Sequence, residues 1–285
     1  MTVATRHVST FAERFARRFD SAVLTERLRE FAGGHSIETD HEPHIIAAVE
    51  WIARAQDSTG SGGIARGYAV AWNPYFALRG WEPAYPETTG YIIPTLYSAA
   101  RALGDPSLAA RAYRAAEWEL GIQLPSGAVR AGILGRPPSP AIFNTGQVIF
   151  GWLSAHAETG ESQFAGAALA AARYLISTLD DDGMWRRDNS RFALSYSTLY
   201  NARVSWALAE VGQRLNMPAA TDAAARSLAH VARLQRKNGW IPSCCLTEPA
   251  RPLLHTLAYA TRGLLEGGRV LEDPELIRRA SIAAG

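Results

Sequence analysis

The side chains best suited to proton transfer stand at matching places in a repeating pattern. Glu87 in YPETTG, Asn144 in FNTG, Tyr196 in YSTLYN and His255 in LLHTLAY each come just before a nearly apolar segment. A carboxylate, a phenol and an imidazole can serve as general base and general acid beside a sugar carbon. We therefore predict Glu87, Tyr196 and His255 as catalytic residues and Asn144, whose amide cannot exchange a proton, as a substrate-binding residue.

These residues also have a purely structural interpretation. Glu87 could cap a helix by accepting hydrogen bonds from N–H groups of its own turn, and His255 could be a buried histidine with satisfied hydrogen bonds. A glycosidase needs two carboxyl groups. Because Asn144 stands where a second carboxyl group would be useful, a lyase or epimerase fits these residues better than a hydrolase.

Aromatic side chains are concentrated in the stretch from Tyr68 to Tyr85, which we expect to be a long loop. Long loops inside a compact domain usually have a function. Flat aromatic faces stack on sugar rings, and arginine binds carboxylates in a bidentate manner. The residues predicted to bind substrate here are Trp72, Arg79, Trp81 and Tyr85.

Polar side chains interrupt the apolar segments that follow the four candidate residues. Buried polar groups must either pair with each other or face a cavity. We predict that the following residues face the cavity and bind substrate: Gln147, Tyr200, Asn201, Arg203 and Tyr259. A structural pair of Arg203 with Glu210 or Glu266 is the alternative.

A repeat of about 56 residues places these side chains. Four threonines mark it at intervals of 56, 53 and 58 residues: Thr89, Thr145, Thr198 and Thr256. The segments ALGDPSLAARA and VLEDPELIRRA are near copies, in which Asp105 and Asp273 are predicted N-caps followed by proline at the first helical position. Glycine turns close each unit. Such self-similarity indicates tandem helical hairpins.

The two helices of each hairpin differ in character. The first is apolar nearly all round, as in Gly146–Ala155 and Leu199–Ala209, and the second is amphipathic, which is typical of a buried inner layer and a half-exposed outer layer. We predict an all-α chain without strands, an α/α toroid of five to six hairpins whose ring need not be closed. Pro94 suggests that one inner helix begins near Tyr91, and an outer helix is expected at Glu42–Asp57.

One domain is expected to span residues 1–285, with residues 1–40 forming a helical segment that docks on the barrel. This segment carries Phe11, Phe15 and Phe19 on one side and arginines on the other. Docking of the phenylalanines on the barrel is the favoured interpretation, and contact with a membrane surface is the alternative.

Four motifs, YPETTGYIIPTL, FNTGQVIFG, YNARVSWAL and HTLAYATRGLLE, occur in this order and spacing. Together they resemble the bacterial polysaccharide-biosynthesis proteins of exopolysaccharide gene clusters, over roughly Trp51 to Glu272. That family is similar in fold to the six-hairpin glycosidases, whose active site lies at the centre of the inner helices. The family pattern has Asp where this chain has Asn144 and Thr where it has Ala202. The resemblance implies a fold and a pathway rather than a reaction.

Composition and cysteine content bear on the ligand class, the cellular compartment and the presence of a metal. The net charge of +2 gives no reason to expect nucleic acid. The two cysteines, Cys244 and Cys245, are adjacent, so no disulfide framework is expected, and with no signal peptide or membrane-spanning run we predict a cytoplasmic protein. The cysteine pair near His255 lacks further zinc ligands, so we predict no metal and no cofactor.

The sequence therefore predicts a carbohydrate-active protein of exopolysaccharide biosynthesis that binds a neutral or acidic glycan in the central cavity and processes it as a lyase, epimerase or hydrolase. A non-catalytic glycan-binding or scaffold protein is the alternative. A terpene-cyclase-like enzyme is a third, but the Asp180–Asp182 run does not spell that family's Asp-x-Asp-Asp motif and is predicted to be a solvated turn.

Overall fold

The computed structural model describes residues 20–33, 40–190, 193, 198–246, 248, 251 and 253–285. Tyr196 and the predicted stripe of Phe11, Phe15 and Phe19 lie outside these residues. The chain divides into two units, Met1–Ala84 and Tyr85–Gly285. The expectation of one domain over residues 1–285 stays a prediction.

The N-terminal unit contains helices and one small sheet. Helix α2 (Ser21–Ala32) is capped by Asp20, and helix α3 spans Glu42–Asp57, as predicted. Strands β1 (Tyr68–Asn73) and β2 (Leu78–Trp81) pair in antiparallel fashion, with Tyr68 opposite Trp81. The prediction that this stretch is a loop and that the chain has no strands is therefore wrong. Aromatic and β-branched residues favour strands, and cross-strand aromatic pairs stabilise them.

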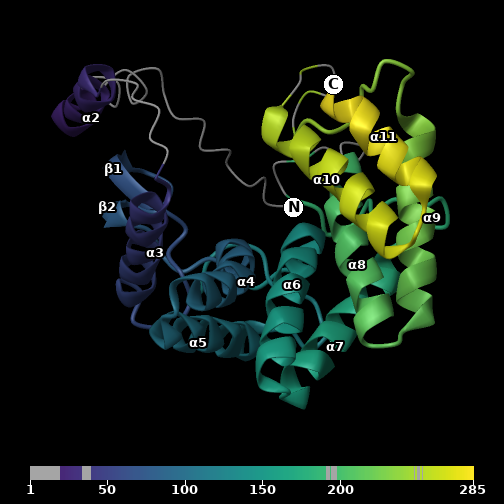
Figure 1. The fold of residues 1–285 in the computed structure, drawn as a ribbon, viewed down its shortest axis with the longest axis horizontal. Helices are drawn as coiled ribbons and strands as arrows, with labels where there is room; N and C mark the ends of the chain where they lie inside the picture. The colour runs from purple at the N-terminus through teal and green to yellow at the C-terminus, as the bar shows by residue number, and fades with distance from the viewer. Residues whose placement is uncertain are drawn as a thin grey trace. The chain divides into compact units, whose positions relative to one another are not determined.

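The C-terminal unit is a series of four helical hairpins (Figure 1). The first helices of the hairpins are α4 (Pro86–Leu103), α6 (Ile142–Thr159), α8 (Ala202–Arg214) and α10 (Leu254–Val270). The second helices are α5 (Pro106–Ile122), α7 (Ser162–Thr178), α9 (Pro218–Leu234) and α11 (Pro274–Ala284). A short 3-10 helix, η1 (Leu199–Asn201), leads into α8.

The helices of this unit form two layers. Helix α4 packs on α6, α6 on α8, and α8 on α10, while each second helix packs mainly on the first helix of its own hairpin. This is the arrangement of inner and outer helices that the sequence predicts. The fold is all-α apart from the small hairpin and is of the α/α-toroid class.

Glycines allow the inner helices to approach closely. A Cβ on Gly90 of α4 would lie 2.9 Å from the Cα of Val148 in α6. A Cβ on Gly146 of α6 would lie 2.9 Å from side-chain atoms of Val204 in α8. These two glycines are the last residues of the ETTG and FNTG motifs, so the motifs encode helix contacts as well as chemistry.

The repeat markers of the outer layer are confirmed. Asp105 accepts a hydrogen bond from Ser107 N, and Asp273 from Glu275 N, at the starts of α5 and α11. The glycine turns are tied to the next outer helix by glutamine. The Nε2 of Gln123 donates to the carbonyls of Gly127 and of Ala167 in α7, at 2.9 and 3.0 Å.

Helix α4 begins earlier than predicted. Pro86 occupies its first position, where the missing N–H has no partner to lose, and Pro94 lies inside the helix. Pro94 cannot bond the carbonyl of Gly90, one turn back. A Cβ on Gly151 of α6 would lie only 3.3 Å from that oxygen, so the carbonyl packs against the neighbouring inner helix. Glu87 is therefore in the first turn of α4 rather than in the preceding loop.

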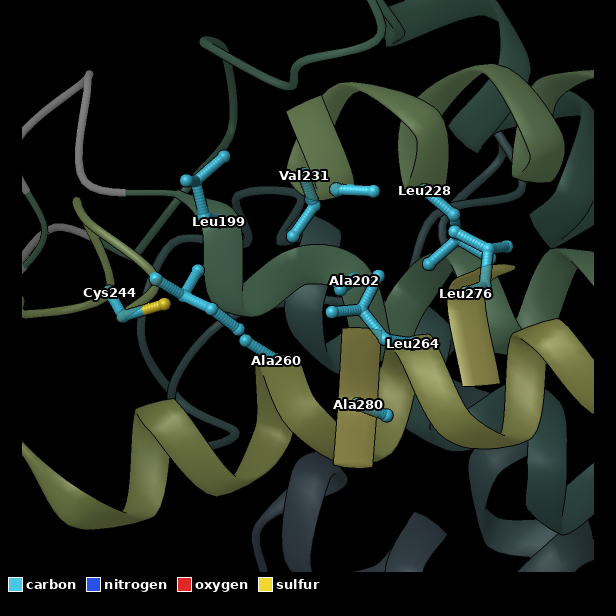
Figure 2. Packing of buried hydrophobic residues seen from close by; sticks show 11 residues of the cluster. Leu199, Ala202, Leu228, Val231, Cys244, Ala260, Leu264, Leu276 and Ala280 are labelled. Carbon is cyan, nitrogen blue, oxygen red and sulfur yellow. The ribbon is translucent and has the colours of Figure 1, made fainter. Parts of the chain in front are cut away.

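The apolar core between α8, α9, α10 and α11 is shown in Figure 2. Leu228 of α9 and Leu264 of α10 are fully buried there. Cys244 belongs to this core, where it lies with Leu199 and Ala260, and burial raises the pKa of its thiol to about 12. Cys244 therefore behaves as a small apolar side chain.

Candidate functional site

The predicted site residues of the C-terminal unit stand in the first turns of inner helices, not before them. Glu87 is the second residue of α4, Asn144 the third of α6 and His255 the second of α10. The prediction that they precede the helices is wrong, because α4 and α6 start about one turn earlier than their apolar stretches suggest. Tyr85 is the N-cap of α4.

Arg203, in the first turn of α8, is the centre of the site. Its side chain is buried, and its Nε donates a hydrogen bond of 2.7 Å to Oε1 of Gln147. The guanidinium carbon lies 5.1 Å from the ring centre of Tyr91, 5.4 Å from that of Tyr259 and 5.3 Å from that of Trp206. Among the described residues no carboxylate forms an ion pair with it. The predicted pairing of Arg203 with Glu210 or Glu266 is therefore wrong.

The two glutamates have other partners. Glu210 accepts a hydrogen bond from Trp206 Nε1 at 2.9 Å and pairs with Arg214 at 2.6 Å. Glu266 pairs with Arg262 and Arg269 on the same helix. The i to i+4 spacing within one helix makes such pairs easy to form, which leaves Arg203 to the aromatic rings.

A regular spacing explains how these side chains meet. Residues 56 positions apart occupy the same level on successive inner helices. One level contains Tyr91, Gln147, Arg203 and Tyr259, and the next contains Pro94, Phe150, Trp206 and Arg262. Contacts occur within each level: Tyr91 stacks on Tyr259 with ring centres 6.4 Å apart, and Phe150 meets Trp206 at 4.3 Å.

Glu87 belongs to the level one turn before Tyr91. Burial raises the pKa of Tyr91 well above its ordinary value, and the charge of Glu87 acts in the same direction. The pKa of Tyr200 is raised by the same two causes. Both phenols therefore stay protonated at neutral pH and lie within electrostatic reach of the Glu87 carboxylate. A protonated phenol beside a carboxylate is a possible acid and base pair.

Burial also lowers the pKa of the Arg203 guanidinium from its ordinary value, and the nearby charge of Arg262 acts in the same direction. An arginine nevertheless remains charged in proteins. Among the described residues, this buried cation contacts aromatic faces and one amide oxygen. Such a group favours an anionic ligand.

The remaining predicted residues have defined partners. Asn144 donates from Nδ2 to the carbonyl of Arg130 at 3.0 Å. Asn201 is buried and donates from Nδ2 to Oδ1 of Asn189 at 2.9 Å. The exposed ring of His255 lies edge-on to Tyr259, with ring centres 5.7 Å apart. Phe143 connects Tyr200 to Tyr259, at 5.5 and 5.0 Å.

The predictions missed four of these aromatic residues: Tyr91, Phe143, Phe150 and Trp206. The signal was present, because Tyr91, Gln147, Arg203 and Tyr259 are each 56 residues apart, and so are Phe150 and Trp206. Reading the repeat at every inner-helix position, rather than only at the threonines, would have found them.

Trp72, Arg79 and Trp81 lie on the hairpin of the N-terminal unit. Arg79 is 3.7 Å from Asp20, the N-cap of α2. Whether these three residues bind the same ligand as Arg203 stays a prediction.

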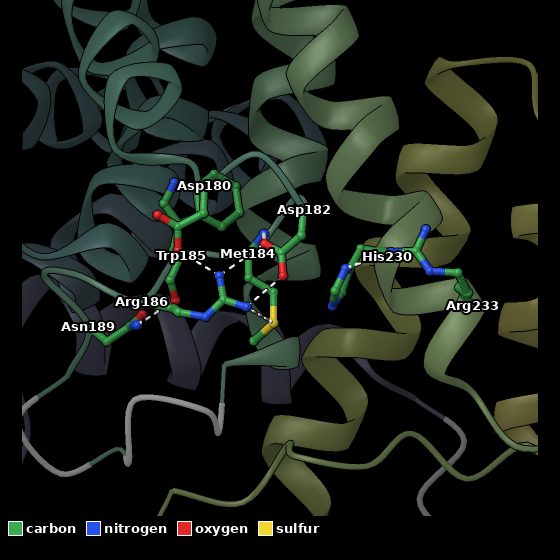
Figure 3. Close-up of polar contacts among 8 residues, drawn as sticks. All are labelled: Asp180, Asp182, Met184, Trp185, Arg186, Asn189, His230 and Arg233. Atoms are coloured by element: carbon green, nitrogen blue, oxygen red, sulfur yellow. Dashed lines mark hydrogen bonds and ion pairs between the residues drawn. The ribbon is translucent and has the colours of Figure 1, made fainter.

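The Asp180–Asp182 run is a structural turn, as predicted (Figure 3). Arg186 donates to Asp180 at 2.8 Å and to both oxygens of Asp182 at 3.0 and 2.5 Å. The pKa of Asp182 is lowered to about 2, chiefly by these hydrogen bonds. Trp185 is buried and donates from Nε1 to the carbonyl of Leu175. Its role is packing.

No three His, Cys, Asp or Glu side chains among the described residues are arranged to hold a metal ion. Within the same residues, no helix has the length and apolar character that crossing a membrane requires.

A solved structure with the same architecture is an unsaturated glucuronyl hydrolase specific for heparin. It matches with a TM-score of 0.62 and 19% sequence identity, over 84% of this chain and 65% of the hydrolase. The two proteins share a fold. It is the α/α-toroid fold that the sequence predicts. This chain thus covers less than two thirds of the hydrolase's length.

The Lin0763 protein from Listeria innocua also matches, with a TM-score of 0.57 and 14% identity, over 92% of this chain and 70% of that protein. No protein-family model and no curated protein sequence matches this chain. The resemblance to exopolysaccharide-cluster proteins therefore stays a prediction.

Proposed function

We propose that this chain is a carbohydrate-active protein that binds an acidic glycan at the Arg203 cluster and processes it by proton transfer. The observation that carries the proposal is the meeting of Tyr91, Gln147, Arg203 and Tyr259, one residue from each inner helix, around a buried guanidinium without a described carboxylate partner. Aromatic faces, an amide and a cation together suit a sugar that carries a carboxylate.

The charge balance supports the acidic ligand. Burying an arginine without a carboxylate is unfavourable, because the aromatic rings and the Gln147 oxygen replace its hydration only in part. A uronate carboxylate would supply the missing charge and accept two parallel N–H bonds.

Proton transfer is assigned to Glu87, with His255 and Tyr196 as the other predicted catalytic residues. Glu87 lies near the protonated phenols of Tyr91 and Tyr200, so a carboxylate base and a phenol acid occur in one cluster. In a lyase or epimerase reaction the base removes a proton from a sugar carbon and the acid returns one to the leaving oxygen or to the carbon.

A hydrolase reaction remains a candidate because the hydrolase of similar fold acts on unsaturated glucuronyl residues of heparin. In hydrolysis of a glycosidic bond, Glu87 takes a proton from the attacking water and a phenol gives a proton to the leaving oxygen. In hydration of a double bond, one carbon gains a proton from a phenol and the other gains the water oxygen, whose proton Glu87 removes. The proposed setting of this reaction is exopolysaccharide biosynthesis in the cytoplasm, and the four sequence motifs support the pathway.

The first test is Glu87→Gln, which preserves the shape of the side chain but removes the exchangeable proton. Two substrates serve as probes: an unsaturated uronyl disaccharide, followed by loss of the ultraviolet absorbance of its double bond, and a saturated uronate oligosaccharide, followed by sugar analysis. Turnover should fall by about 10²–10⁴ while affinity changes little. Unchanged turnover in Glu87→Gln would remove Glu87 from the reaction.

The second test is Arg203→Gln, measured with a uronate oligosaccharide and its carboxyl-reduced neutral counterpart. The variant should lose affinity for the acidic ligand and keep that for the neutral one. Equal losses for both would show that Arg203 does not bind the carboxylate. Arg278→Gln, which removes an exposed positive charge on α11, is the matched control.

A non-catalytic glycan-binding protein is the second candidate. Its support is Asn144, which bonds the carbonyl of Arg130 and cannot exchange a proton. Wild-type protein that binds uronate oligosaccharides but turns over neither probe would favour this candidate.

A further inference from the structure

Three aromatic rings form an exposed cluster in the N-terminal unit, which we call the aromatic triad: Trp51 of α3, Tyr68 of β1 and Trp81 of β2. Trp51 lies 4.7 Å from Trp81 and 6.0 Å from Tyr68, and Tyr68 lies 5.1 Å from Trp81, measured between ring centres. Trp51 and Tyr68 each remain 47% exposed. Two large aromatic residues left half in solvent in one cluster mark an interaction surface.

The triad stands on a rigid base. Tyr68 and Trp81 are opposite each other in the hairpin. Directly after Trp81, the buried carboxylate of Glu82 accepts hydrogen bonds from Arg66 at 2.9 Å and from Asn73 at 2.6 Å. These bonds connect both strands and the segment before them. The rings are therefore held in place before any ligand arrives, which reduces the entropy lost on binding.

The rim of the triad is charged with both signs. The guanidinium of Arg54 lies 5.8 Å from the ring centre of Trp51 and 3.8 Å from the carboxylate of Glu50, and both charged side chains are more than half exposed. A pyranose ring has apolar C–H faces and hydroxyl groups at its edge. The triad offers flat faces for the former, and its rim offers donors and acceptors for the latter.

The geometry points to the aromatic triad as a glycan-binding surface that stacks pyranose rings of a polysaccharide chain without selecting for a carboxylate. This inference rests on the proposed function for the class of ligand, but it concerns different residues. Trp81 was predicted to bind substrate, whereas Trp51 and Tyr68 come from the structure. A second copy of the chain is the competing occupant, and the test below distinguishes it.

The test is affinity electrophoresis of the whole protein in native gels that contain dextran, xylan, alginate or hyaluronan. Wild type should be retarded by at least one neutral gel. Trp51→Ala should reduce the affinity about tenfold, which corresponds to 1.4 kcal/mol. Trp51→Leu should do the same, because it keeps an apolar side chain and loses the flat ring. Phe31→Ala, which removes a 92% exposed ring outside the triad, is the control and should have no effect.

Three results would overturn the inference. These are wild type that no neutral gel retards, Trp51→Leu that binds as wild type does, and wild-type dimers that Trp51→Ala converts to monomers in sedimentation velocity. Circular dichroism checks that each variant is folded. The variants should fold, because Ala and Leu both favour helices and Trp51 is an exposed residue of α3. If Glu87→Gln keeps full turnover while Trp51→Ala still loses binding, the proposed catalysis fails and the triad stands.

Discussion

The environment of Arg203 gives this chain its most specific chemical feature. The hydrogen bond to Gln147 fixes the orientation of the guanidinium, and the rings of Tyr91 and Tyr259 contact it from neighbouring helices. A single polar side chain in an otherwise apolar, buried helix is ordinary. Together they surround a desolvated positive charge, and an acidic ligand is the simplest complement to that charge.

The hydrogen bond donated by Asn144 can be tested by replacing its side-chain nitrogen with oxygen. Its Nδ2 donates to the carbonyl of Arg130, and the residue is buried. In Asn144→Asp a carboxylate would face a carbonyl oxygen, so neither acceptor would have a donor. We expect a loss of about 1–3 kcal/mol in the free energy of unfolding at neutral pH, measured by urea denaturation.

The loss in Asn144→Asp should shrink in acid, because the protonated carboxyl can again donate to the carbonyl. The folded state raises the pKa of this new Asp, so its stability is greatest below the unfolded pKa and falls as pH rises. Asn144→Ala removes the hydrogen bond without adding charge, so its loss should not depend on pH. Parallel pH profiles of the two variants would contradict this account.

Glycine contacts set the spacing of the inner helices. A Cβ on Gly263 of α10 would lie 2.3 Å from the carbonyl carbon of Ala202 and 2.5 Å from the backbone nitrogen of Arg203. Because backbone atoms cannot move aside as a side chain can, this contact holds α10 directly against the start of α8. The same contact fixes the distance between Tyr259 and Arg203, so the glycine supports the candidate site.

Gly263→Ala should therefore separate α8 from α10. We expect a loss of about 1–3 kcal/mol or more in the free energy of unfolding, as for other overpacked contacts, and weaker binding of uronate oligosaccharides. Gly166→Ala is the matched control, since it lies inside α7 with open space around it, and it should stabilise the protein by up to about 1 kcal/mol. Equal melting temperatures for the two variants would exclude the contact as a determinant of helix spacing.

Individual elements show where the sequence was informative. The helix at Glu42–Asp57 and the Asp105 and Asp273 caps were predicted correctly, because periodicity and capping residues are local signals. The start of α4 was predicted too late, because a proline such as Pro94 normally marks the start of a helix. It is tolerated inside α4 in a tertiary setting, where the carbonyl of Gly90 faces Gly151, and no local rule contains that contact.

At the scale of the whole molecule, the 56-residue repeat was sufficient to predict two layers of helices and the fold class. It was not sufficient for the site. Which of the polar residues meet depends on the level each occupies along its helix, and Arg203 pairs with Gln147 from the same level rather than with Glu210 two turns later. The hairpin was missed because Tyr68 and Trp81 stabilise it through a cross-strand contact, which is not a local signal.

The repeat also exposes one residue that breaks its pattern, and this residue should govern the stability of the whole molecule near neutral pH. Glu119 of α5 is fully buried, and neither carboxyl oxygen has a hydrogen-bond partner among the described residues. The residues 56 and 112 positions later are Leu175 and Val231, both buried and apolar. Burial raises the pKa of Glu119 well above its ordinary value.

A raised folded pKa means that the stability associated with protonated Glu119 is fully present below the unfolded pKa of about 4.3 and is lost as pH rises toward the folded value. In Glu119→Leu this decline should disappear, and the free energy of unfolding near pH 7 should increase by about 1–3 kcal/mol, because a buried unpaired polar group is removed. Urea denaturation at several pH values between 4 and 8 measures both effects. Glu117→Leu, which replaces an exposed glutamate of the same helix, should leave the pH profile unchanged. A Glu119→Leu profile that falls with pH as steeply as that of wild type would show that another group causes the decline.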